Sequence, residues 1–89
     1  MSKRQTMPVG NGVLFIPVTE IIKHSNGVAL RQGSFCEIGN SVIQIPQESP
    51  ATIKAIKVNG ELYVRVICNE VELAFIPLPE RISSILVKH

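Results

Sequence analysis

The side chains in this chain of 89 residues that are best suited to covalent chemistry are those of Cys36, Cys68, His24 and His89. A cysteine thiolate next to a histidine base is a common nucleophile, and the two partners need not be close in sequence. However, the cysteines lie far apart, and no histidine stands at the spacing of a zinc site. Each cysteine also alternates with apolar residues, which is typical of a buried thiol. We therefore predict core cysteines, and no catalytic residues, metal or cofactor.

A second kind of chemistry, anion binding, is indicated by two cations. Asn59-Gly60 is the preferred pair for a two-residue type I′ hairpin turn, and this turn places Lys54 directly opposite Arg65. Like charges in this position cost on the order of 0.2–1 kcal/mol, which a bound anion would relieve. Tyr63 shares their face and could stack on a base. The competing interpretation is a solvated ion pair between Arg65 and Glu72 on the next strand.

The overall charge gives little support to nucleic-acid binding. Nine Lys and Arg face seven acids, all of them Glu, for a formal charge of +2. A phosphate-binding surface normally has a denser cluster of cations. The residues that could contact phosphate or another anion are Lys3, Arg4, Lys54, Lys57 and Arg65.

The clearest element is an antiparallel meander over residues 52–76, divided by turns at Asn59-Gly60 and Asn69-Glu70. The second turn is a poorer match to type I′ and could be a four-residue loop instead. Strand alternation places one set of side chains on the inner face: Leu62, Val64, Val66, Cys68, Val71, Leu73 and Phe75. The outer face is also apolar, and we predict it to be a protein interface formed by Ile56, Tyr63, Ile67, Ala74 and Ile76.

The remaining segments are less regular. We predict a strand at 13–18, a hairpin of 34–38 and 41–45 about Gly39-Asn40, and a short C-terminal helix at 79–88. The alternative for 79–88 is an edge strand, because Ile82, Ile85 and Val87 are β-branched. Residues 19–24 fit either one helical turn or the first arm of a hairpin. A weak repeat of 14–22 at 74–82 favours the helix.

These elements predict an α+β, β-rich fold, with a small antiparallel sheet or partly open barrel and a C-terminal helix; the alternative is an all-β barrel. Residues 1–12 are expected to be a flexible N-terminal arm, and 13–89 one β-rich domain. Apolar residues make up 45% of the chain and charged residues 18%, which excludes a disordered chain. No apolar stretch is long enough to cross a bilayer and no signal peptide is evident, so a cytoplasmic location is expected.

The prediction of function depends on the apolar outer face of the predicted meander. One helix can cover only one face of the sheet, and the other face needs a partner. We therefore predict a small non-enzymatic regulatory or assembly module that acts through protein association as a homodimer, together with a further protein of unknown identity. The alternative is a β-rich nucleic-acid-binding regulator that uses Lys3, Arg4, Lys54 and Arg65.

Overall fold

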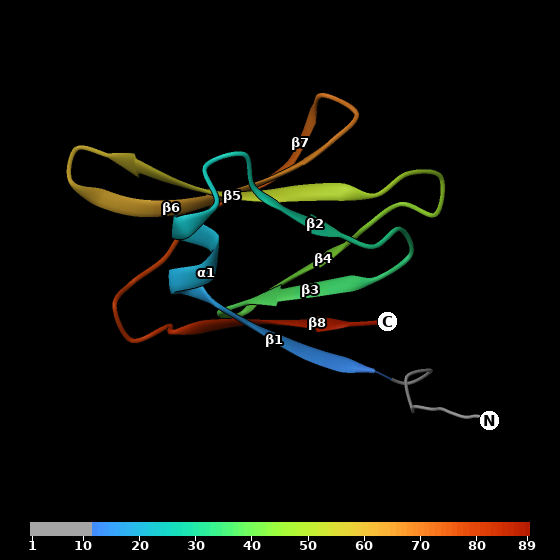
Figure 1. Cartoon of the computed structure of the whole chain (residues 1–89), viewed down its shortest axis with the longest axis horizontal. Helices are drawn as coiled ribbons and strands as arrows, with labels where there is room; N and C mark the ends of the chain where they lie inside the picture. Colours follow the sequence, from blue (N-terminus) through green and yellow to red (C-terminus); the bar gives the residue numbers. More distant parts are fainter. Residues whose placement is uncertain (1–11) are drawn as a thin grey trace.

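The computed structural model describes residues 12–89 as two four-stranded antiparallel sheets and a short helix. One sheet has the strand order β1-β8-β3-β4 and the other β2-β5-β6-β7, and Figure 1 shows them as two layers with α1 between them at one end. This arrangement confirms the β-rich antiparallel class. The elements are β1 (Val13–Pro17), α1 (Val18–Lys23), β2 (Val28–Leu30), β3 (Phe35–Ile38), β4 (Ser41–Gln44), β5 (Ala51–Val58), β6 (Glu61–Cys68), β7 (Val71–Pro77) and β8 (Ser84–Lys88).

The predicted meander is confirmed as β5, β6 and β7. Asn59 and Gly60 have φ values of 52° and 83°, as a type I′ turn requires. Asn69 and Glu70 also have positive φ, at 50° and 67°, so the second turn has two residues and not four. The backbone of Glu70 therefore has a left-handed conformation that residues other than Gly and Asn rarely adopt.

A β-bulge in β7 changes the predicted faces. Cys68 pairs with Val71 and Ile67 with Glu72, but Val66 then pairs with Ala74, so Leu73 is the extra residue. The register inferred from the turn is therefore correct up to Glu72 and shifted by one residue beyond it. As a result, Ala74 and Ile76 pack against the core, and Phe75, predicted inside, lies outside.

The predicted helix at 79–88 is wrong. Pro79 to Ile82 form a turn closed by a hydrogen bond from the Ile82 amide to the Pro79 carbonyl, and β8 follows. The strand is not at an edge, because it pairs with both β1 and β3. Ile85 and Val87 are buried and alternate with more exposed residues. Their β-branched side chains fit a central strand better than a marginal ten-residue helix.

The helical interpretation of 19–24 is confirmed by α1, which buries Val18 and Ile21. The hairpin alternative fails because β2 pairs with β5 instead of with the preceding segment. Contacts of α1 with β1 and β5 link the two sheets. The predicted arm at 1–12 lies outside the described residues except for Gly12, whose carbonyl accepts a hydrogen bond from the His89 amide at 3.1 Å.

The hydrophobic core fills the space between the sheets. Both sheets and α1 contribute side chains that are almost inaccessible to solvent, and burial of this apolar area is the main force that holds the layers together. The predicted hairpin about Gly39-Asn40 is confirmed as β3 and β4. The most deeply buried apolar residues are Ile21, Leu30, Cys36, Ile38, Ile45, Ile53, Val64, Val66, Ile85 and Val87.

Candidate protein-interaction surfaces

The outer face of the meander carries the predicted charged group. Lys54 is the direct strand partner of Arg65, as the first turn predicted. Arg65 Nε lies 2.9 Å from Glu72 Oε1, so the ion-pair interpretation is confirmed. The Nε–H direction does not satisfy hydrogen-bond geometry, which makes the contact an ion pair without a good hydrogen bond. Both side chains are more than 40% exposed, so we expect the pair to contribute little to stability.

An aromatic pair lies beside this group. The Tyr63 and Phe75 rings are stacked with centroids 4.9 Å apart and planes 6° from parallel. The Arg65 guanidinium carbon is 5.5 Å from the Phe75 centroid, within the range of a cation–π contact. One face of each ring is therefore already covered by the protein. Because stacking on nucleic-acid bases needs free ring faces, this arrangement reduces the surface available for it.

The outer face of the meander exposes less apolar area than the sequence predicted. Ile56, Tyr63 and Ile67 lie on it as predicted, and each is half-buried. Ala74 and Ile76, predicted as interface residues there, are turned to the core by the bulge. The apolar area left on this face is therefore smaller than predicted.

The predicted cations are not all gathered in one place. Lys54 and Arg65 lie together, but Lys57 has the opposite strand parity and lines a groove at the end of the two sheets. Lys3 and Arg4 lie outside the described residues. The structure thus brings together two of the five residues proposed to contact an anion.

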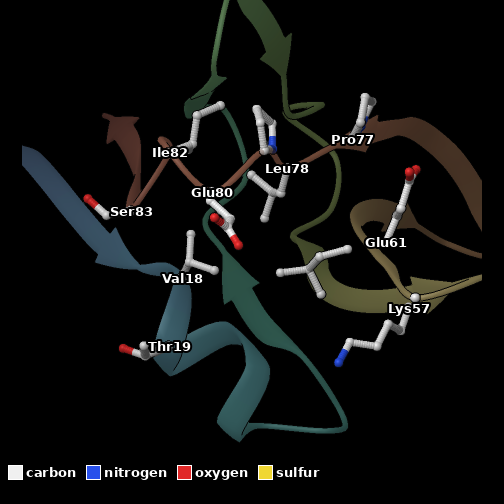
Figure 2. A pocket seen from close by; sticks show the side chains of 12 residues that line it. Val18, Thr19, Lys57, Glu61, Pro77, Leu78, Glu80, Ile82 and Ser83 are labelled. Carbon is white, nitrogen blue, oxygen red and sulfur yellow. The ribbon is translucent and has the colours of Figure 1, made fainter.

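The groove between the sheets has a volume of about 900 Å³. Figure 2 shows Val18 and Leu78 on its apolar wall, Lys57 and Glu61 at its rim, and the Glu80 carboxylate directed into it. The rim thus carries charges of both signs, and they do not single out one class of ligand.

Five of the nine large apolar side chains that are exposed among residues 12–89 belong to the other sheet, where sequence reasoning did not place them. Strand register puts Phe15, Leu86, Glu37 and Val42 in one row across the outer face of β1-β8-β3-β4, and Val13, Lys88 and Phe35 in the adjacent row. Val13, Phe15, Phe35 and Val42 are 55%, 63%, 40% and 63% exposed. We call these four residues and Leu86 the apolar patch.

The patch could have been found from the sequence had residues 84–88 been assigned as a strand. In a strand, Leu86 alternates with the core residues Ile85 and Val87, so it points outward like Phe15 in β1. The patch holds an ion pair as well, between Lys88 Nζ and Glu37 Oε2 at 2.9 Å. Glu37 lies between Leu86 and Val42, and Lys88 lies between Val13 and Phe35, so the pair stands among the apolar side chains and its two charges neutralise each other.

The cysteines and the internal histidine are not arranged for nucleophilic chemistry. Cys36 is fully buried, and its burial, followed by the nearby Glu37 carboxylate, raises the pKa of its thiol to about 11. Such a thiol stays protonated at neutral pH. His24 is exposed at the end of α1 and lies 3.3 Å from Glu20. Cys68 is buried, and its thiol donates a weak hydrogen bond to the Ser49 carbonyl at 3.7 Å.

Residues 12–89 lack two further features. This part of the chain holds no group of three or more His, Cys, Asp or Glu side chains that could bind a metal ion. Nor does it contain a helix with the length and apolar character needed to cross a bilayer.

Comparison of the chain with protein-family models, with curated proteins and with solved structures found no match in any of the three.

Proposed function

We propose that this chain is a small non-enzymatic module with a regulatory or assembly role, which acts by protein association and first forms a homodimer. The observation that carries the proposal is the apolar patch. Phe15 and Val42 are each 63% exposed on one sheet face, and their neighbours Val13 and Phe35 are also exposed. Monomeric proteins rarely expose several large apolar side chains close together on one face, and such surfaces commonly mark interaction sites.

The charge pattern of the patch favours a protein partner. Its ion pair, Lys88 with Glu37, is internally neutral. A surface for nucleic acid would instead present unpaired cations to the phosphates. A partner that covers this face therefore gains mainly from burying apolar area, at about 25 cal/mol per Å².

The experiment is light scattering after size-exclusion chromatography over a wide range of protein concentration. The expected result is a reversible shift from the mass of one chain to that of two, with little change between low and high salt because apolar contacts are weakly screened. A single-chain mass at every concentration would contradict the homodimer.

A second candidate function, nucleic-acid binding, is supported by the direct pairing of Lys54 with Arg65. Lys3, Arg4 and Lys57 would be further phosphate contacts. Glu72 and Phe75 already engage Arg65, which weakens this candidate. A titration with mixed DNA and RNA at two salt concentrations tests it, because binding that releases counterions falls steeply with salt.

A further inference from the structure

We propose that two copies of this chain pair through the open edge of β1, strand to antiparallel strand, so that the β1-β8-β3-β4 sheets of both copies become one continuous sheet. The inference rests on the proposed homodimer and names its contact. The starting observation is that, within residues 12–89, β1 is an edge strand with Val13, Leu14 and Phe15 all more than half exposed. Unpaired backbone groups along such an edge are a template for another strand.

The other three edges are protected in ways that β1 is not. β7 carries the bulge and Glu72, both of which are common defences against edge pairing. β2 has three residues, and β4 has four with polar residues at both ends. β1 has five residues, none of them charged or polar. Apart from Pro17 at its end, β1 has none of these defences, and its apolar edge is a template for a partner strand.

The hydrogen bonds between β1 and β8 show which backbone groups of β1 have no partner within residues 12–89. The Val18 amide bonds to the Ser83 carbonyl and the His89 amide to the Gly12 carbonyl, so even-numbered residues face β8. Because these bonds alternate along an antiparallel pair, Val13 and Phe15 direct their N–H and C=O groups to the open edge. Pro17 contributes a carbonyl there and has no N–H to leave unpaired.

These free groups are complementary to those of a second copy. Full overlap of two β1 strands places the two-fold axis at Phe15, the middle residue of the strand. Each Phe15 amide then meets the Phe15 carbonyl of the other copy, and each Val13 amide meets a Pro17 carbonyl. Pro17 accepts this bond but has no N–H to donate in return, so the Val13 carbonyl opposite it stays unpaired in the dimer. The self-complementary pattern is what an isologous interface needs.

The buried area indicates a reversible contact. The exposed parts of Val13, Leu14 and Phe15 amount to roughly 300 Å² per copy, on the scale of 150–250 Å² for one whole aromatic side chain. With the backbone and Pro17 included, the dimer would bury at most about 1,000 Å² in total, because part of Val13 and Phe15 stays exposed on the outer face, and this is at the low end for specific interfaces. β1 and its flanking positions Gly12 and Val18 carry no charge, so no side-chain charge within this segment opposes the pairing. We expect dissociation in the micromolar range.

The test compares Val13→Pro with Val13→Ala by light scattering at several concentrations. Proline at position 13 removes an N–H that points to the open edge and leaves the hydrogen bonds to β8 intact. Edge strands tolerate proline at such positions. We expect Val13→Pro to weaken the dimer at least tenfold and Val13→Ala to weaken it less than threefold. Equal dimerisation of the two variants would overturn the inference.

Amide hydrogen exchange on the unmodified protein gives a second, independent measurement. In the proposed dimer, Val13 and Phe15 are protected together with Leu14 and Ile16. Protection that alternates, with Leu14 and Ile16 alone slow to exchange, contradicts edge pairing.

A further comparison of variants separates the two proposals. If Phe35→Ser with Val42→Ser abolishes the dimer and Val13→Pro does not, the homodimer stands and its contact is the apolar patch. If the protein is a monomer in every measurement, both the homodimer and its contact through β1 are contradicted.

Discussion

Arg65 illustrates how much one side chain's surroundings can be deduced from sequence. Its position opposite Lys54 follows from the Asn59-Gly60 turn, and the nearness of Glu72 follows from the second turn. Its contact with Phe75 does not follow, because the two faces of β7 are almost equally apolar. With no polar face to fix the register, a one-residue bulge leaves no trace in the hydrophobic pattern. The sequence therefore predicts the positions of Lys54 and Arg65 correctly and that of Phe75 incorrectly.

Glu70 provides a prediction at the same scale. Its φ of 67° is unfavourable for a side chain with a Cβ, whereas glycine adopts it freely. Because Glu70 is exposed, we expect Glu70→Gly to raise the free energy of unfolding by about 1 kcal/mol. Urea denaturation measures the change. Glu70→Ala keeps the Cβ and should give no such gain, so equal effects of the two substitutions would count against the turn geometry.

Among the elements, the hairpins were predictable and the C-terminal strand was not. Gly39-Asn40 and Asn59-Gly60 are local signals whose turn chemistry acts over four residues. By contrast, residues 84–88 form a strand because β1 and β3 lie on either side to pair with them. That information is non-local. In isolation, Leu78, Ile82, Ile85 and Leu86 match a helical stripe nearly as well.

The two assignments of this segment make opposite predictions for neighbouring residues. In β8, Val87 is 2% exposed, whereas Leu86 lies on the outer face. We expect Val87→Ala to lower the free energy of unfolding by about 2 kcal/mol and Leu86→Ala by about 1 kcal/mol or less. Thermal and urea denaturation of both variants provide the measurement. A larger cost for Leu86→Ala would instead support the helical stripe.

For the whole molecule, the sequence predicted excess apolar surface but placed it on the wrong sheet. The bulge, the Tyr63–Phe75 stack and Arg65 cover much of the meander face, and the excess appears on β1-β8-β3-β4. Pairing through β1 would join the apolar patches of two copies side by side into one larger surface. The homodimer would then present a two-fold platform for a further protein, consistent with a regulatory or assembly role.

The most direct test of this pairing is disulfide formation in Phe15→Cys. Residues opposite each other in a hydrogen-bonded antiparallel pair have Cα atoms about 5.5 Å apart, within the range of a disulfide. Only residue 15 meets its own copy across the proposed axis, and the native Cys36 and Cys68 are buried. Val13→Cys, which would face Pro17, is the matched control. We predict that mild oxidation links Phe15→Cys into a covalent dimer at least tenfold faster than Val13→Cys, measured by non-reducing electrophoresis. Equal rates, or no covalent dimer, would contradict the account.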